Sequence, residues 1–492
     1  MVGWLFSWLL TVVGVGYGWI DPFIGLMAYY ALTSLRPPYT WFWAFDGSFP
    51  KQIQWAALAT LAGWVITGFG STKGLKYVKW PMLGLAVYLA SGTLAWQFFC
   101  INATVAWDAL SVQLKIGLMT LVTLMLVTSE MRIKAFTWLI VGSLCYLAES
   151  FNEWYARLPL YLWSHGWGGV DNNGVAMIMV MGVPLAFFLM LNPAKLRPLH
   201  RWILAAVLAL VAVNSTATSG KVGLVIGVCS VAATVLLLTT ETWGVRVACF
   251  LGVGCLVHVV LFSYSRGGQV GLIMVGTLLF IFALVSLPRK MLTITLALVA
   301  VFLSLQLAGA QVRARFMTIM PFLGEPGQRE ASAESRFSTW AGGWACIQDH
   351  PFGVGPRNFN LISDHYGLPY NKSIHNLFLQ TGADYGIPGM IGLFVFYVGT
   401  FVQCYITSLH PVARRLVWPR YYCQMVSISL AGMLVCSQFI GMESVETGFM
   451  VAIIGMVTVA HVRRIAEAEA QVSPEALPEL RQAVRSELVP SM

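Results

Sequence analysis

The fold of this chain is decided by apolar runs such as the one at residues 268–287, which reads GQVGLIMVGTLLFIFALVSL and contains no charged side chain. A helix needs about 20 consecutive apolar residues to cross the hydrocarbon core of a bilayer. Similar runs recur from one end of the 492-residue chain to the other, and 58% of the residues are hydrophobic while only 10% are charged. A soluble protein would carry about a quarter charged residues. The composition therefore predicts an all-α, polytopic integral membrane helix bundle.

The apolar runs predict about 12 to 15 transmembrane helices, because several of them are close to the shortest length that can span. The expected spans are residues 3–20, 22–35, 53–70, 81–100, 116–131, 135–150, 173–192, 202–218, 221–240, 246–264, 268–287, 291–310, 386–408, 421–440 and 448–462. They divide the chain into N-terminal helices with outer loops (1–172), central helices (173–310), a large, partly helical polar loop (311–385), C-terminal helices (386–464) and a tail (465–492).

The net charge of +9 is explained by topology, and no nucleic acid is expected as a partner. Lys and Arg concentrate in the cytoplasmic loops of membrane proteins. The basic clusters that fall on one side of the predicted bundle are Lys73/Lys76/Lys79, Arg132/Lys134, Lys195/Arg197/Arg201, Arg246, Arg289/Lys290, Arg414/Arg415 and Arg463/Arg464. This side is predicted to be cytoplasmic. The opposite side then holds the loops 36–52, 151–172 and 441–447, the turns near 219 and 266, and the polar loop 311–385.

The polar loop 311–385 is where chemistry is expected, since its Gly- and Pro-rich backbone cannot sit in hydrocarbon. Within it, residues 332–349 read as a helix whose apolar face is formed by Phe337, Trp340, Trp344 and Ile347. Ser332 or Ser335 is expected to cap this helix, which places Arg336 in its first turn. There Arg336 either pairs with Glu334 or joins the helix N-terminus in holding an anion.

A second candidate cation is Arg266, in the turn Ser265-Arg266-Gly267-Gly268 between two apolar runs. It either anchors to lipid headgroups or, with the backbone N–H groups of the turn, holds a phosphate. The segment 218–224 resembles residues 264–272 and places Lys221 at an equivalent position. This similarity reflects either chance between membrane turns or an internal duplication.

Other polar residues have a structural and a functional interpretation. His375 is expected in a first helical turn, where a lowered pKa favours the neutral imidazole that can accept a proton; a structural His is the alternative. Gly355, within His350–Pro356, serves a turn or allows a ligand close to the backbone. Asn172, which follows Asp171 at the start of a span, belongs to a helix cap or binds carbohydrate.

No metal or cofactor is expected. The nine cysteines are scattered, mostly within apolar runs, and show neither a CxxC pair nor a Cys/His spacing typical of metal sites.

Two elements resemble a known family. One is the Ser265-Arg266-Gly267 turn after an apolar span. The other is the series Ser335-Arg336, Trp340, Ala345, Ile347, His350-Pro351, Gly353-Val354-Gly355, Phe359, His375-Asn376, Leu379-Gln380 and Tyr385-Gly386-Ile387-Pro388-Gly389. Their order and spacing resemble the O-antigen ligase/polymerase family, bacterial membrane glycosyltransferases that use an undecaprenyl-diphosphate glycan donor. Asp171-Asn172-Asn173 after an aromatic outer loop is similar to the O-glycosylation ligase branch.

The resemblance implies a multi-pass protein of the bacterial inner membrane whose active site faces the periplasm, acting in lipopolysaccharide biosynthesis or protein glycosylation. It implies catalytic roles for Arg266 and Arg336 at the donor diphosphate and for His375 in transfer. Lys221 is a candidate third cation, and Asn376, Asn172 and Gly355 are candidates for substrate binding. We expect a metal-independent, inverting transfer to an acceptor hydroxyl on lipid A-core or protein.

Two points stay open. Asp349, Asp364 and Asp384 orient the His375 ring only if the loop folds them inward; otherwise the arginines carry the reaction and His375 positions the acceptor. The same donor chemistry also suits a polymerase that extends the glycan. A transporter of small anions is the alternative from another class, although such sites lie near the bilayer midplane.

Overall fold

The computed structural model describes residues 2–158, 160–193, 198–217, 221–288, 327–441 and 446–471, together with positions 290, 291, 294, 295 and 298. Throughout these ranges the regular structure is helical and no strand forms, apart from an isolated two-residue bridge between Trp167 and Val170. The all-α prediction is confirmed.

The long helices of the first half are α1 (Val2–Gly18), α2 (Pro22–Leu35), α5 (Gln52–Ile66), α6 (Lys79–Phe98), α7 (Ala103–Leu126), α8 (Glu130–Arg157), α10 (Asn172–Leu191), α11 (Pro198–Ala217) and α12 (Lys221–Thr239). Those of the second half are α13 (Glu241–Phe262), α14 (Arg266–Ser286), α17 (Gly327–Asp349), α18 (Leu377–Ser408), α20 (Trp418–Cys436) and α21 (Glu446–Ala470). Short helices connect them: α3 (Pro37–Thr40), α4 (Phe42–Phe45), η1 (Leu75–Val78), α9 (Tyr161–His165), η2 (Phe359–Tyr366) and α19 (Pro411–Leu416).

By length and composition, seven helices in the described ranges can cross a membrane: α7, α8, α10, α13, α14, α18 and α21. Shorter apolar helices are found at Gly3–Gly18, Gln52–Ile66, Arg201–Val213 and Gly223–Thr239. The polytopic membrane fold is therefore confirmed. The expected span 291–310 lies almost entirely outside the described residues, and the count of about 12 to 15 spans stays a prediction.

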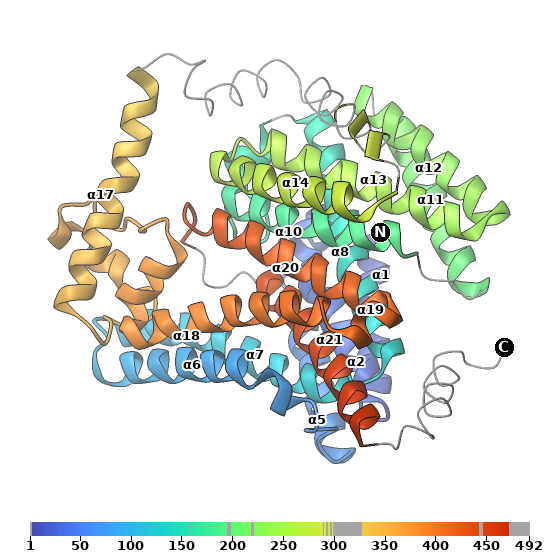
Figure 1. Cartoon of the computed structure of the whole chain (residues 1–492). Helices are drawn as coiled ribbons and strands as arrows, with labels where there is room; N and C mark the ends of the chain where they lie inside the picture. The colour runs from blue at the N-terminus through green and yellow to red at the C-terminus, as the bar shows by residue number, and fades with distance from the viewer. Residues whose placement is uncertain are drawn as a thin grey trace.

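Helix α10 lies inside the bundle, where it packs against α8, α13, α14 and α20 (Figure 1). Its most apolar stretch is 83% buried by protein, the highest share among the candidate spans. Helices α6 and α18 lie side by side and antiparallel (Figure 1). A Cβ added at Gly84 of α6 would be 2.6 Å from the carbonyl oxygen of Gly392 in α18, so the two backbones touch. Close approach at small residues is a common way for helices to pack in membranes.

Contacts between loops mark the two ends of the bundle. At one end, Lys76 pairs with Glu467 at 2.7 Å, Arg132 pairs with Asp21 at 3.3 Å, and Arg415 pairs with Glu469. At the other end, Arg36 and Glu446 are 3.4 Å apart, and the Trp167 indole N–H donates to Thr40 Oγ1 at 3.2 Å. Among the described residues, the clusters that contain Lys76, Arg132 and Arg415 thus lie at the first end, and the loops that contain Arg36, Thr40 and Trp167 lie together at the second.

The span predicted to start at residue 386 begins earlier, because Asn376 caps α18 and the helix runs from Leu377 across a kink at Gly386. Pro388 lacks the N–H that would continue the helical ladder, and carbonyls before the kink find other donors. Val354 N donates to Ala383 O at 3.0 Å and Gly355 N donates to Asp384 O at 2.9 Å. This bonding docks the loop around residues 350–358 onto α18.

Candidate active site

Three predicted catalytic residues come together at the end of the bundle opposite the basic clusters. Arg266 is the first residue of α14, Arg336 lies on α17, and His375 stands just before α18. Burial lowers the pKa of the Arg336 guanidinium, and the positive charge of neighbouring Arg266 lowers it further. Arg336 is in turn among the charges that lower the pKa of His375. The geometry agrees, because residues 439–441 contact all three: the Phe439 ring centroid lies 5.2 Å from the Arg336 guanidinium carbon, and Cβ atoms added at Gly267 and Gly441 would be 2.8 Å from Phe439 Cβ and 3.3 Å from His375 N. The structure therefore brings the three residues into one site.

Arg266 lies in a turn that is fixed by a helix cap and by close packing. The Ser265 side chain accepts a hydrogen bond from Gly268 N at 3.0 Å and caps α14. A Cβ at Gly268 would be 2.4 Å from Ala176 Cβ on α10, so only glycine fits this helix contact. The Arg266 Nε is buried and has no hydrogen-bond partner among the residues that the structure describes. A buried, unpaired guanidinium N–H is a group that an anionic ligand would satisfy.

The predicted start of the helix that carries Arg336 is wrong. Helix α17 begins at Gly327 rather than at a cap on Ser332 or Ser335, because Arg329, Glu330 and the following Ala and Glu residues are good helix formers. Arg336 therefore lies in the third turn, and the N-terminus of α17 does not help it to bind an anion. Its guanidinium carbon instead lies 5.2 Å from the centroid of the Phe439 ring.

The predicted apolar face of α17 is only partly buried. Ile347 is buried and Trp340 is half-buried against the loop core, while Phe337 and Trp344 are exposed. The contact face is shifted toward Thr339, whose hydroxyl donates to the carbonyl of Ile374 at 3.0 Å. This bond ties α17 to the residue directly before His375.

His375 was expected in the first turn of a helix, but it lies just before α18. Its φ of 54° is left-handed, a conformation that costs energy for a residue with a side chain and is common at functional sites. Burial is the main cause that lowers its pKa; Lys372 and Arg336 lower it further, and Asp171 opposes them. The predicted direction is therefore confirmed, but its cause is burial and not a helix terminus. The lowered pKa favours neutral imidazole near neutral pH.

Asn376 is the N-cap of α18. Its side-chain oxygen accepts from Phe378 N and Leu379 N, each at 3.1 Å. Its Nδ2 donates to Gln438 Oε1 at 3.1 Å. These bonds fix the backbone next to His375.

Among the aspartates considered for orienting His375, Asp384 supports the neighbouring backbone. It is fully buried; its Oδ1 accepts from Phe359 N at 2.8 Å and its Oδ2 accepts from Gln380 Nε2 at 2.7 Å. Gln380 Oε1 then accepts from Ile374 N at 2.9 Å. The carboxylate that acts on the charge of His375 is Asp171, the N-cap of α10. Sequence reasoning noticed Asp171 as a cap but could not pair residues so distant in the chain.

The remaining predicted residues occupy supporting positions. Asn172 Nδ2 donates to the carbonyl of Ser263 at 2.8 Å, three residues before Arg266. Gly355 has a φ of 97°, and a Cβ there would be 2.5 Å from Cys100 Cβ. Its backbone is thus covered by the segment that follows α6 rather than left open to a ligand. Lys221 is the first residue of α12, and its side chain lies outside the described part of the structure.

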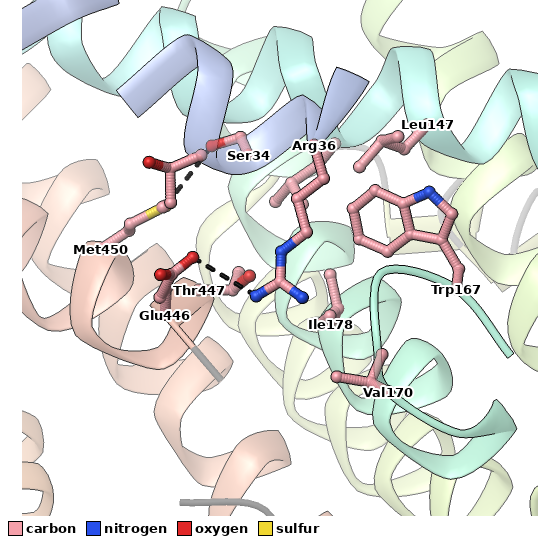
Figure 2. A pocket seen from close by; sticks show the side chains of 11 residues that line it. Ser34, Arg36, Leu147, Trp167, Val170, Ile178, Glu446, Thr447 and Met450 are labelled. Atoms are coloured by element: carbon pink, nitrogen blue, oxygen red, sulfur yellow. Dashed lines mark hydrogen bonds and ion pairs between the residues drawn. The ribbon is translucent and has the colours of Figure 1, made fainter. Parts of the chain in front are cut away.

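A neighbouring pocket provides a contrast for the two arginines (Figure 2). It is lined by residues of α2, α8, α10 and α21 and of the segments that follow α2 and α9, among them Ser34, Arg36, Leu147, Trp167, Ile178 and Glu446. Arg36 donates to the Gly168 carbonyl, pairs with Glu446 at 3.4 Å and lies 5.8 Å from the centroid of the Trp167 ring. Its charge is therefore already neutralised. Neither Arg266 nor Arg336 has such an ion pair within the described ranges.

Sequence reasoning missed residues 437–441, because residues 437–440 were assigned to the end of a membrane span and residue 441 to an outer loop. The structure ends α20 at Cys436 and turns the following residues toward Arg336, Gly267 and His375. The only sequence signal was the polar pair Ser437-Gln438 near the end of an apolar run.

Comparison with known proteins gives one family match. Residues 251–394 match a family model described as O-antigen ligase, and the matched segment contains Arg266, Arg336 and His375. A search of curated proteins found no match. The predicted resemblance to the O-antigen ligase family is therefore confirmed over residues 251–394.

Proposed function

We propose that this protein is a membrane glycosyltransferase that moves a glycan from undecaprenyl diphosphate to an acceptor hydroxyl on the periplasmic face of the bacterial inner membrane. The observation that carries the proposal is the grouping of two guanidinium groups, neither with a described carboxylate partner, beside an imidazole with a lowered pKa. A polyprenyl diphosphate presents adjacent anions at the membrane surface, which bidentate arginine contacts suit.

In the proposed reaction, Arg266 and Arg336 bind the diphosphate of the donor. The Nε2 or Nδ1 atom of neutral His375 accepts the proton of the acceptor hydroxyl, whose oxygen attacks the anomeric carbon. The bond between that carbon and the diphosphate oxygen breaks, and its electron pair leaves with the diphosphate. The two guanidinium groups stabilise the negative charge that develops there. Attack opposite the leaving group inverts the anomeric centre, and no step requires a metal ion or a cofactor.

The other predicted residues have supporting roles in this proposal. Asn172 acts through the backbone before Arg266, and Asn376 acts through the backbone after His375. Gly355 permits the contact with Cys100 that seats the loop. Lys221 is proposed as a third cation near the donor. The acceptor is proposed to be a lipid A-core sugar or a protein hydroxyl. The orientation rests on the basic clusters, which favour the cytoplasm.

The test is transfer in reconstituted membranes. Purified protein receives undecaprenyl-diphosphate glycan and a lipid A-core or peptide acceptor in the presence of a chelator. We expect wild type to transfer the glycan and His375→Ala and Arg336→Ala to lose transfer. Arg357→Gln is the matched control, because Arg357 is exposed on the same loop; it should retain activity. One product band indicates a ligase, and a ladder indicates a polymerase.

A wild type that consumes no donor with any acceptor would contradict the proposal. If the same vesicles instead take up small anions in a manner that depends on Arg336, the protein is a transporter. Equal losses in Arg357→Gln and Arg336→Ala would also contradict the assignment of Arg336.

A further inference from the structure

Residues 437–441 lie at the centre of the candidate site although none of the predicted catalytic residues belongs to them. They follow α20 directly, and the carbonyl of Ser437 accepts from Leu377 N, the first residue of α18, at 2.8 Å. The end of α20 and the start of α18 are therefore bonded to each other. This segment contacts both the arginines of the site and the backbone that presents His375.

The first contact is with the arginines. The Phe439 ring lies with its centroid 5.2 Å from the Arg336 guanidinium carbon. The same residue covers the turn that carries Arg266, because a Cβ at Gly267 would be 2.8 Å from Phe439 Cβ. A ring beneath a guanidinium attracts its charge and fixes its plane. This matters here because Arg266 and Arg336 repel each other.

The second contact is with the backbone that presents His375. Gln438 Oε1 accepts from Asn376 Nδ2 at 3.1 Å, and Gln438 Nε2 donates to the Leu434 carbonyl at 3.1 Å. A Cβ at Gly441 would be 3.3 Å from His375 N, so the segment also packs on His375 itself. The left-handed φ of His375 is thus held between the cap of α18 and this segment.

We infer that residues 437–441 are a positioning element that aligns the donor-binding arginines with the transfer histidine, Phe439 acting on Arg336 and Gln438 acting on His375 through Asn376. The inference rests on the proposed function. It assigns the two residues separable effects: Phe439 on donor binding and Gln438 on the rate of transfer and its pH dependence.

For Phe439, the informative comparison is Phe439→Leu against Phe439→Tyr. Leucine removes the aromatic face, and the KM for undecaprenyl-diphosphate glycan should rise about threefold to tenfold. Tyrosine keeps the face and should stay within about twofold of wild type. Phe439→Met, which fills space without a ring, repeats the test should the leucine variant unfold in detergent, and thermal unfolding is measured for each variant. The assignment is overturned if Phe439→Leu and Phe439→Met leave the donor KM unchanged. It is also overturned if Phe439→Tyr raises the donor KM as much as Phe439→Leu does.

For Gln438, the variant is Gln438→Met, which keeps the length of the side chain and removes the oxygen acceptor. The groups that set the charge state of His375 are Lys372 on its own loop, Asp171 on α10 and Arg336 on α17, and none of them is changed. Loosening the backbone should admit water to the imidazole. We expect kcat to fall about tenfold and the acidic midpoint of the pH–rate profile to move up toward the ordinary His value, with donor KM unchanged.

Unchanged kcat and midpoint in Gln438→Met overturn the role of Gln438, as does a loss confined to donor KM. These outcomes are distinct from failure of the proposed function. A wild type that transfers no glycan overturns the proposed function and this inference with it. A wild type that transfers, alongside variants that match it, overturns the inference alone.

Discussion

At the scale of single residues, the site is defined by two arginines, Arg266 and Arg336, that have no ion pair with any described carboxylate. Arg36 shows how this chain neutralises a cation that it uses for structure, with a carboxylate, a carbonyl and an aromatic ring (Figure 2). Arg266 has a buried Nε without a hydrogen-bond partner among the described residues. The Arg336 guanidinium carbon lies 5.2 Å from the centroid of the Phe439 ring, and no described carboxylate pairs with it. Holding two like charges together costs energy that a bound diphosphate would recover.

The pH dependence of transfer follows from His375. Its lowered pKa means that the neutral, proton-accepting form predominates above a midpoint below the ordinary value. The rate should therefore rise through mildly acidic pH and be level near neutrality. Asp171 raises this pKa, so Asp171→Asn should move the midpoint down, while asparagine still caps α10. The pH profile of kcat measures this; a midpoint that stays or rises would show that Asp171 does not act on the imidazole.

The chemistry of the cations gives a second residue-scale prediction. Arg266→Lys keeps the charge but loses the planar fork of donors that fits a phosphate in a bidentate manner. We expect donor KM to rise about tenfold, the equivalent of about 1.4 kcal/mol of binding free energy. The steady-state KM for the donor is the measurement. Arg36→Lys serves as the comparison, because its ion pair with Glu446 tolerates a point charge, and its donor KM should not change.

At the scale of elements, the loop around residues 350–358 is seated by backbone contacts at the kink of α18. Gly353 has a φ of 82°, and a Cβ there would be 2.5 Å from Asp384 O and Gly386 N. Gly353→Ala should therefore lower stability by more than the roughly 1–3 kcal/mol of backbone strain alone, and abolish transfer.

Gly367 provides the matched control for Gly353. Its φ is 74°, but no atom lies within 4 Å of an added Cβ, so Gly367→Ala carries the strain without the collision. Thermal unfolding of the two variants in detergent, with transfer rates, separates the effects. Equal losses in both variants would mean that the contact with α18 does not hold the loop.

The close crossing of α6 and α18 can be tested in the same way. A Cβ at Gly392 would be 2.6 Å from Tyr88 N and 2.7 Å from Gly84 O, so Gly392→Ala forces the two helices apart at a cost of about 1–3 kcal/mol. Gly142→Ala in α8 meets nothing within 4 Å and should be neutral or slightly stabilising. The unfolding midpoint of each variant is the readout, and a stable Gly392→Ala protein would argue against this packing.

Much of the fold could be predicted from the sequence because apolar length is a strong signal for spans. The span predicted at 22–35 coincides with α2. Arg336 and His375 were recognised as candidate site residues from the order of the motifs around them. The start of α17 was missed, since Ser332 or Ser335 was expected to cap it. The extent of α18 was also missed, since its span was expected to begin only at residue 386. The turns before residue 386 carry Gln380 and Asp384, which are buried by protein, and a single sequence does not reveal that burial. The roles of Asp171 and Phe439 depend on contacts between distant segments.

At the scale of the whole molecule, the two ends of the bundle differ in chemistry, and the site lies opposite the end where Lys76, Arg132 and Arg415 form ion pairs. This arrangement predicts which end is extracytoplasmic. Tyr370→Cys, at an exposed position of the polar loop, should react with a membrane-impermeant maleimide in intact spheroplasts. Lys73→Cys, at the opposite end, should react only after permeabilisation. Wild type provides the background from its own cysteines, and the reversed pattern would invert the topology.

The central claim is that Arg266 and Arg336 bind one diphosphate. Its most direct test is a double-mutant cycle for binding of undecaprenyl diphosphate to the protein in nanodiscs, with Arg266→Gln, Arg336→Gln and both together. If the two arginines hold the same group, the loss in the double variant will differ from the sum of the single losses by at least about 0.5 kcal/mol. Single losses that add within error, or binding that neither substitution weakens, would contradict a shared diphosphate site.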